Sequence, residues 1–160
     1  MKDALEDFRE TLRSAAPRLQ SMTEEESAAR RWSGKWSAKE TLGHLIDSAA
    51  NNHQRFVRAQ FTDELVFPGY EQQEWVAAQH YQQASWPALI QLWLNYNLHL
   101  LHLISHIPEA KLTVPRRVHN LDRIAWQTVS RDEPVTLEYF IRDYIGHLQH
   151  HLQQIYDAAG

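Results

Sequence analysis

Four long segments of this sequence repeat apolar residues at the spacing of an α-helix, and this pattern limits the possible folds more than any other feature. The segments cover residues 2–20, 37–61, 85–107 and 136–158. Glycine and proline, which interrupt helices, number only five and six in a chain of 160 residues. Helices of this length, each with one apolar stripe, predict an all-α protein built as a four-helix bundle.

Signals for helix ends support these segments. Residues 37–40, SAKE, form a capping box, in which the serine accepts from an amide three residues on and the glutamate reaches back. Ser85 is placed to cap the helix that begins at SWPALI, and Pro87 lies in its first turn, where a missing N–H costs little. Pro17 predicts a kink or a break near the end of the first helix.

Two other stretches complete the expected organisation. EQQEWVAAQHYQQ, residues 71–83, predicts a short extra helix. Residues 108–134 form a long irregular connection before the last helix, and such connections are usually functional or mobile. The length suits one hydrophobic core, so we expect a single domain over residues 1–160.

Composition and charge exclude several classes of protein. The chain has no cysteine, which removes disulfides, cysteine-type zinc sites and thiol nucleophiles. Its net charge of −4, with no basic block, argues against nucleic-acid binding. An apolar signal sequence is missing from the N-terminus, and no apolar run reaches the length of a membrane span. We therefore expect a cytoplasmic protein that binds neither nucleic acid nor membrane.

The last helix carries three histidines in the stretch DYIGHLQHHLQQI. On a helical wheel, His151 lies on the apolar face, His147 at its border and His150 on the solvent side. His147 and His151 are four positions apart, so their Cβ atoms are neighbours, roughly 5–6 Å apart. Two imidazoles so placed can converge on one metal ion, or they can be hydrogen-bonded histidines of the bundle. The spacing alone leaves both interpretations open.

Histidines on other helices compete as further ligands. His53 lies on the apolar face of its helix, where it is either a core histidine or a ligand, and we favour the core interpretation. His44 lies opposite that face, in a polar stripe that either faces solvent or lines a wet cavity. Three more, His99, His102 and His106, lie off the apolar face of the helix over residues 85–107 and are expected at the surface.

Three stretches, WSAKETLGHLIDSAANNHQRF, FPGYEQQEWV and DYIGHLQHHLQQI, together resemble the DinB-like (DinB/YfiT-like) superfamily of metalloenzymes. The resemblance extends over about residues 36–155. It implies a four-helix bundle and a divalent metal held by three histidines, one from an HL pair on the second helix and two from HxxxH on the last. Carried onto this sequence, these are His44, His147 and His151. The resemblance therefore selects His44 over His53, which periodicity does not.

A site with three imidazoles and an open position is typical of catalytic rather than structural zinc. We expect Zn or Ni, with Fe, Mn or Cu as alternatives, because imidazole binds several of these ions. The open position would hold a water, whose pKa the ion lowers towards about 7, or a thiol substrate as its thiolate. Asp47, three residues after His44, is the candidate general base.

Members of the superfamily include metal-dependent hydrolases and transferases or isomerases that use low-molecular-weight thiols. The resemblance thus implies a metal-dependent enzyme for a small molecule, either a hydrolase or a transferase using such a thiol. The alternatives are a bundle that binds metal or ligand without catalysis and a protein-interaction bundle with structural histidines. Six tryptophans in a small domain and polar-aromatic outer faces further suggest a homodimer.

Four more residues have two interpretations each. Asp143 and Glu40 lie one turn before a predicted ligand, so each either holds that ligand's second ring nitrogen or is solvated. Trp126 either covers the mouth of the pocket or packs its own loop. Tyr144 could bond a ligand, but its place on the apolar face favours a core role.

Overall fold

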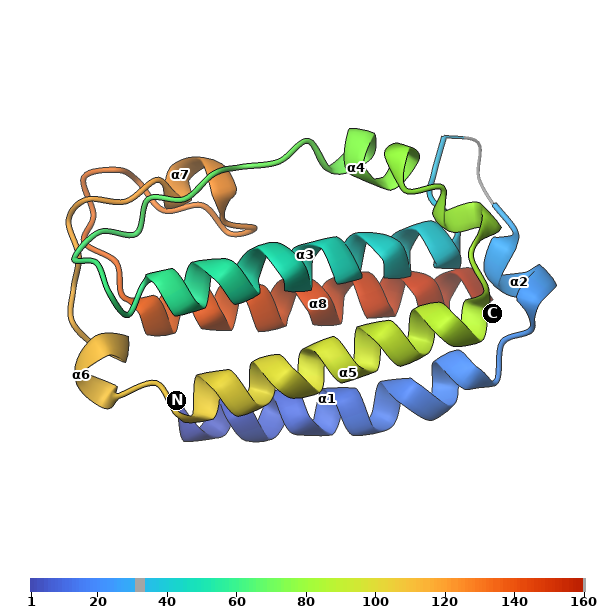
Figure 1. Cartoon of the computed structure of the whole chain (residues 1–160), viewed down its shortest axis with the longest axis horizontal. Helices are drawn as coiled ribbons and strands as arrows, with labels where there is room; N and C mark the ends of the chain where they lie inside the picture. The colour runs from blue at the N-terminus through green and yellow to red at the C-terminus, as the bar shows by residue number, and fades with distance from the viewer. Residues whose placement is uncertain (31–33, 160) are drawn as a thin grey trace.

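Four long helices form a bundle in the computed structural model, which describes residues 1–30 and 34–159 (Figure 1). They are α1 (Lys2–Gln20), α3 (Ala38–Arg58), α5 (Trp86–Ser105) and α8 (Leu137–Ala159). Each corresponds to one of the predicted segments, with ends no more than three residues away. Over the described residues there are two isolated β-bridges and no strand, so the predicted all-α four-helix bundle is confirmed. Within the same residues, no helix is long and apolar enough to cross a membrane.

The four long helices do not alternate in direction along the chain. α1 and α8 run one way along the bundle, and α3 and α5 run the other way (Figure 1). α3 packs against α5 and α8, and α1 packs against the same two helices. α3 and α5 are therefore parallel neighbours, which a short loop cannot join. Residues 59–85 return along the length of the bundle before α5 begins.

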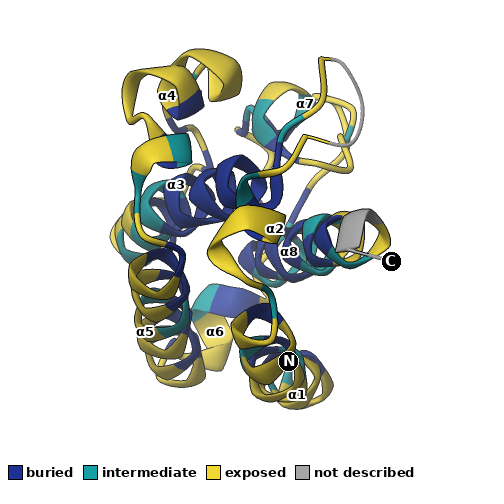
Figure 2. Cartoon of the chain, turned by 90° about the vertical axis from the view of Figure 1, so that its right-hand side faces the viewer, coloured by how far each residue is buried: buried dark blue, intermediate teal, exposed yellow. Residues whose placement is uncertain are grey.

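One hydrophobic core joins the four long helices. Fully buried side chains from each of them meet in it: Phe8, Leu42, Trp93, Leu100, Ile141 and Leu148. Burying a side chain of this size contributes about 2 kcal/mol. α3 differs from the other helices because every residue over 37–49 is buried, as the dark blue ribbon in Figure 2 shows.

Two long connections bury the outer side of α3. They carry four short helices, α4 (Gln72–Ala78), η1 (Tyr81–Gln83), α6 (Glu109–Leu112) and α7 (Leu121–Ile124). α4 and α7 lie beyond α3 and α8 on the side away from α1 and α5 (Figures 1 and 2). The face of α3 that would be exposed to solvent in a simple four-helix bundle is therefore buried beneath these connections.

The two connections are joined to each other by hydrogen bonds. The Leu65 amide donates to the Val118 carbonyl at 2.9 Å, and the Asn120 amide donates to the Leu65 carbonyl at 3.2 Å. The Asn120 side chain adds two bonds to the backbone of Phe67, at 3.1 and 2.8 Å. The segment predicted to be irregular, residues 108–134, therefore contains two short helices, and hydrogen bonds to the other connection hold it against the bundle.

Helix ends follow the sequence signals in part. The capping box over residues 37–40 is present, with both of its hydrogen bonds. Ser85 precedes α5 as predicted, but its side chain makes no capping bond; the Glu24 carboxylate accepts from the Trp86 amide instead, at 2.9 Å. α1 continues through Pro17 for another three residues, so the helix does not break there.

The short helices were predicted less well than the long ones. Residues 71–83 contain two helices rather than one, because His80 between them adopts a left-handed conformation with φ of 52°. α2 (Glu24–Ala28) was not predicted at all. The signal for it was present, since Thr23 and Glu26 form a capping box of their own.

Candidate metal centre

The three histidines that the resemblance selects lie together between α3 and α8. His44 comes from α3, and His147 and His151 are one turn apart on the antiparallel helix α8. One ring nitrogen of each lies within 4.8 Å of those of the other two. The Nε2 atoms of His44 and His147 are 3.2 Å apart. The structure therefore places His44, which periodicity did not select, beside the HxxxH pair.

The distance between these nitrogens fits a tetrahedral metal ion. Zinc–nitrogen bonds are about 2.0–2.1 Å long, so two nitrogens at the tetrahedral angle lie about 3.3 Å apart. The observed separation of 3.2 Å between His44 and His147 agrees with this value. A hydrogen bond between the two rings would give a similar distance, but it would not require a third imidazole beside them.

The pKa of each of the three imidazoles is lowered, which favours the neutral ring at pH 7. Burial, followed by repulsion from His151, lowers the pKa of His44 to about 3. Burial and repulsion from the neighbouring histidines lower the pKa of His147 to about 2. The pKa of His151 is lowered mainly by burial, while its hydrogen bond to Gln154 acts in the opposite sense. A metal ion therefore does not compete with protons for these rings at neutral pH.

The second nitrogens of the rings show which nitrogen is free for a ligand. His151 Nδ1 lies 2.8 Å from Gln154 Oε1, so Nδ1 carries the proton and Nε2 keeps its lone pair. His44 Nδ1 is buried, with no hydrogen-bond partner among the described residues. An unpaired buried N–H costs about 1–3 kcal/mol. A ligand at Nε2 would leave the proton on Nδ1, so among the described residues His44 lacks the second hydrogen bond that usually orients a metal-binding histidine.

The two carboxylates that precede the ligands have other partners. Glu40 accepts hydrogen bonds from Arg30 and from the backbone at the N-cap of α3. Asp143 accepts from the backbone amides of Trp126 and Gln127, at 2.9 and 2.7 Å. Neither alternative from the sequence, a partner for a histidine ring or a solvated charge, describes them. Both carboxylates instead fix segments that lie next to the site.

Asp47, the candidate general base, is buried one turn after His44. It accepts hydrogen bonds from Gln79 Nε2 and the Tyr81 hydroxyl, both at 2.7 Å, while its other oxygen is buried without a partner in the described part of the chain. Burial raises the pKa of Asp47, and these two bonds act in the opposite sense. The contacts join the 59–85 connection to α3. A role for Asp47 as the base stays a prediction.

Gly43 is needed because the ring of Tyr81 lies directly against its backbone. A Cβ at position 43 would overlap that ring, so Gly43→Ala must displace it and its bond to Asp47. Overpacking of this kind costs about 1–3 kcal/mol, and we expect the free energy of unfolding in urea to fall by that amount. Gly69→Ala is the matched control, since a Cβ there meets only Ile124, at 3.7 Å. Equal stability of the two variants would contradict this packing.

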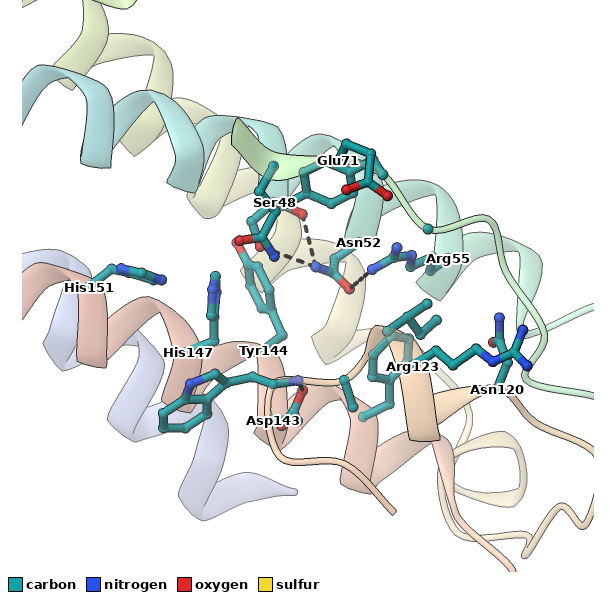
Figure 3. Close-up of a pocket in the computed structure, with 17 residues that line it drawn as sticks. Ser48, Asn52, Arg55, Glu71, Asn120, Arg123, Asp143, Tyr144, His147 and His151 are labelled. Carbon is teal, nitrogen blue, oxygen red and sulfur yellow. Dashed lines mark hydrogen bonds between the residues drawn. The ribbon is translucent and has the colours of Figure 1, made fainter. Parts of the chain in front are cut away.

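A cavity of about 590 Å³ opens beside the histidines, between α3, α8 and their covering connections (Figure 3). Cavities of about 300–1,000 Å³ are typical of small-molecule sites. His147 and His151 line one end of it. Phe140 and Tyr144 continue the same wall along α8. Tyr144 is buried and donates its hydroxyl to Asn97 at 2.5 Å, as expected of a core residue, although its ring also faces the cavity.

A polar stripe of α3 forms the facing wall. Positions 44, 48, 52 and 55 follow one another at helical spacing, so their side chains share one face of the helix. Ser48, Asn52 and Arg55 line the cavity, and all three are buried. Two members of the polar stripe of His44, Ser48 and Arg55, therefore line a cavity, while His44 itself is fully buried and is not part of the lining. Asn52 was not singled out from the sequence; its spacing from His44 was the available signal.

Trp126 lies at the histidine end of the cavity. The centre of its ring is 6.3 Å from that of His147 and 5.3 Å from that of His150. Gly146 leaves room for it, because a Cβ there would come within 3.1 Å of the indole. Asp143 holds its backbone, as described above. Trp126 thus lines the cavity beside the predicted ligands, which favours a covering role over simple loop packing.

The other predicted histidines lie elsewhere. His53 is half-buried rather than part of the core, so the preferred interpretation of it was wrong. Its ring faces His99 and Tyr96, with centres 5.0 and 5.8 Å away. His99, His102 and His106 are exposed, as predicted.

Comparisons with known proteins give a family and a fold. A sequence model described as the DinB superfamily matches residues 6–155. A search of curated proteins gives no match. Among solved structures, this chain is similar to YfiT from Bacillus subtilis, described as a probable metal-dependent hydrolase with an unusual four-helix bundle topology. The TM-score is 0.78 at 17% sequence identity, and the match covers 98% of this chain and 84% of YfiT. At this identity, the likeness shows a shared fold.

Proposed function

The chain belongs to the DinB superfamily, and from this premise we propose that it is a metal-dependent enzyme acting on a small molecule. The observation that carries the proposal is the cluster of three imidazoles, two of which, His147 and His151, line one end of a cavity. Structural zinc sites are closed by four protein ligands, whereas three ligands next to a cavity leave a position for a reactant. The DinB-like fold shared with YfiT, described as a probable metal-dependent hydrolase, supports the same conclusion.

His44, His147 and His151 would hold the ion, for which Zn and Ni are the first candidates and Fe, Mn and Cu the alternatives. A divalent ion supplies Lewis acidity, which polarises a substrate oxygen or sulfur and lowers the pKa of a bound water or thiol. Gln154 fixes the ring of His151 and its tautomer. Trp126 restricts the access of bulk water at this end of the cavity.

Two reaction classes suit the site, hydrolysis and transfer of a low-molecular-weight thiol. The chain has no cysteine, so in a transfer reaction the sulfur nucleophile must come from a second small molecule. Hydrolysis needs only water and a base, and Asp47 is the proposed base. Its pKa is raised by burial, which is the direction that suits a proton acceptor near neutral pH.

Metal content and turnover test this proposal together. We expect untagged protein, purified without added metal or chelator, to hold about one divalent ion per chain by elemental mass spectrometry. The same sample should cleave members of a panel of p-nitrophenyl esters and anilides, or transfer glutathione to 1-chloro-2,4-dinitrobenzene. A chelator should abolish the activity, and the original metal should restore it.

Two other results would support the rival functions. One bound ion without turnover of any panel member would favour a metal-binding bundle without catalysis. Protein that holds no ion, and takes up neither Zn nor Ni when these are added, would favour a protein-interaction bundle with structural histidines.

A further inference from the structure

The wall of the cavity contains a buried positive charge. Arg55 is only 6% exposed, and it lines the cavity from α3. Its guanidinium donates to the Pro68 carbonyl at 2.9 Å and lies 3.5 Å from Asn52 Oδ1. In the part of the chain that the structure describes, its hydrogen bonds go to these neutral oxygens, and none goes to a carboxylate.

A buried guanidinium without an acidic partner is costly unless something else neutralises it. Burial lowers the pKa of Arg55, yet an arginine stays protonated in proteins. The ring of Phe140, 5.9 Å from its Cζ, offers only a weak cation–π contact. A guanidinium has five N–H donors, and the two contacts with Pro68 and Asn52 leave others free towards the cavity.

Arg116 is also buried without a carboxylate partner among the described residues, but it does not line this cavity. Other arginines have an acidic partner or are exposed to solvent. Arg30, for example, is paired with Glu40, and Arg142 with Asp3. The second arginine of the cavity wall, Arg123, is 71% exposed, so solvent already screens its charge. Arg55 is therefore the cavity residue whose charge an anionic ligand would stabilise most.

Arg55 is separated from His147 and His151 along the length of the same cavity (Figure 3). Residues 44 and 55 are eleven positions apart, which places their Cα atoms about 16 Å apart along the helix axis. The contact with Asn52 shows that the guanidinium turns back towards the start of α3, and so towards His44. Ser48 and Asn52 continue the polar wall between the two ends.

We propose that Arg55 binds the carboxylate of a small-molecule substrate whose reacting group lies at the three histidines. The part concerning the histidines rests on the proposed function. A monoanion is the fitting partner because Arg55 supplies one positive charge, and because Glu71 and Asp143, which line the same cavity, would repel a dianion. A guanidinium also matches the two oxygens of a carboxylate in a bidentate contact. The substrate is then an elongated molecule, with roughly 10–15 Å between its carboxylate and its reacting group.

A pair of probes that differ only in charge tests this assignment. 8-Mercaptooctanoate and 8-mercapto-1-octanol have the same chain length, and their thiols can both reach the histidine end. Calorimetric titrations at pH 7 are made on zinc-loaded and on chelator-treated protein. In the parent we expect the acid to bind about ten- to a hundredfold more tightly than the alcohol, because it gains a charge-assisted hydrogen bond to Arg55.

Three variants assign this preference to one side chain. Arg55→Gln should bind acid and alcohol equally, while its zinc content and thermal midpoint stay close to those of the parent. Arg55→Lys keeps the positive charge but loses the planar guanidinium that contacts both carboxylate oxygens. It should therefore keep part of the preference for the acid. Arg58→Gln is the matched control, because it removes the same charge from an exposed position one turn further along α3; it should retain the full preference.

The outcomes separate this inference from the proposed function. Equal binding of acid and alcohol by the parent, or an unchanged preference in Arg55→Gln, overturns the role of Arg55 whatever the metal content. Protein that holds no divalent ion, and takes up neither Zn nor Ni when these are added, overturns the proposed function instead. If the protein binds no metal, chelator-treated protein can still prefer the acid to the alcohol. Loss of that preference in Arg55→Gln would support a carboxylate site at Arg55.

Discussion

Replacing His147 or His151 with alanine should reduce bound metal from about one ion per chain to a small fraction of that, and His44→Ala should do the same. Loss of a partner that only orients a ligand lowers metal affinity about 10–100-fold, so loss of a ligand itself should exceed about 100-fold. The three nitrogens converge from two helices, and any two of them leave the ion with half of a tetrahedral shell. Elemental mass spectrometry of the desalted variants measures the loss directly.

Two histidines of the same helices serve as controls. His150 is exposed on α8 next to His151, and His53 is half-buried on α3. Alanine at either position should leave the metal content unchanged. The His44 variant is the most informative, because the sequence pattern alone did not choose between His44 and His53. Metal retained by His44→Ala and lost by His53→Ala would contradict the site described above.

The four long helices could be predicted because their signal is local. Each repeats apolar residues every three or four positions, and the burial of Phe8, Leu42, Trp93 and Leu148 follows from that repeat. The HxxxH pair is local in the same way, since four positions on one helix fix the relation of two side chains.

The partner of that pair could not be found by the same reasoning. On α3 the wheel separates an apolar from a polar face, and it assigns His44 to the polar one. The polar face is buried because the connections over 59–85 and 106–136 cover it, and their course depends on contacts far apart in sequence. Family resemblance supplied His44, and a polar stripe that includes Arg55 was the one physical hint of a cavity.

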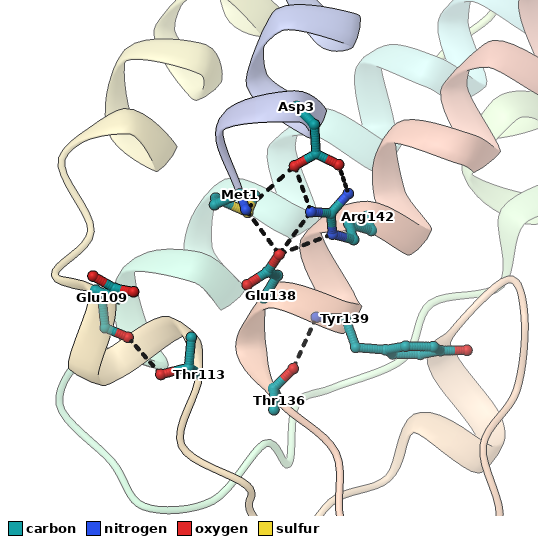
Figure 4. Close-up of polar contacts among 8 residues, drawn as sticks. All are labelled: Met1, Asp3, Glu109, Thr113, Thr136, Glu138, Tyr139 and Arg142. Atoms are coloured by element: carbon teal, nitrogen blue, oxygen red, sulfur yellow. Dashed lines mark hydrogen bonds and ion pairs between the residues drawn. The ribbon is translucent and has the colours of Figure 1, made fainter.

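Contacts between distant residues were equally beyond a local pattern. At one end of the bundle, Arg142 on α8 donates to Asp3 on α1 at 2.7 and 2.8 Å, and to Glu138 (Figure 4). The Met1 ammonium completes this group, 2.9 Å from Glu138. Glu138 and Arg142 are one turn apart on α8, but their pairs with Met1 and Asp3 join residues more than a hundred positions apart in the chain. Nothing local specifies which charged surfaces meet.

Acid should destabilise the metal-free protein strongly between about pH 6.5 and pH 3. Burial holds the pKa of His44 at about 3 and of His147 at about 2, whereas both are about 6.5 in an unfolded chain. Over this range the unfolded chain binds protons that the folded one does not, so the free energy of unfolding decreases as pH falls. The contribution of the two neutral histidines to the free energy of unfolding is complete above pH 7. At pH 4, each histidine should have lowered that free energy by about 3 kcal/mol.

Urea unfolding of chelator-treated protein at pH 7.0, 5.5 and 4.5 measures this effect, with His147→Gln as the matched variant. Burial raises the pKa of Asp47 and Asp143, so these carboxylates act in the opposite sense as pH falls. The informative quantity is therefore the difference between parent and variant, which should shrink steadily with acid because glutamine does not titrate. Saturating zinc should move the parent's transition to lower pH, since the ion binds only the neutral rings of the folded state. A constant difference across the three pH values would mean that position 147 does not take up a proton on unfolding, and would contradict the buried, neutral histidine on which the metal centre depends.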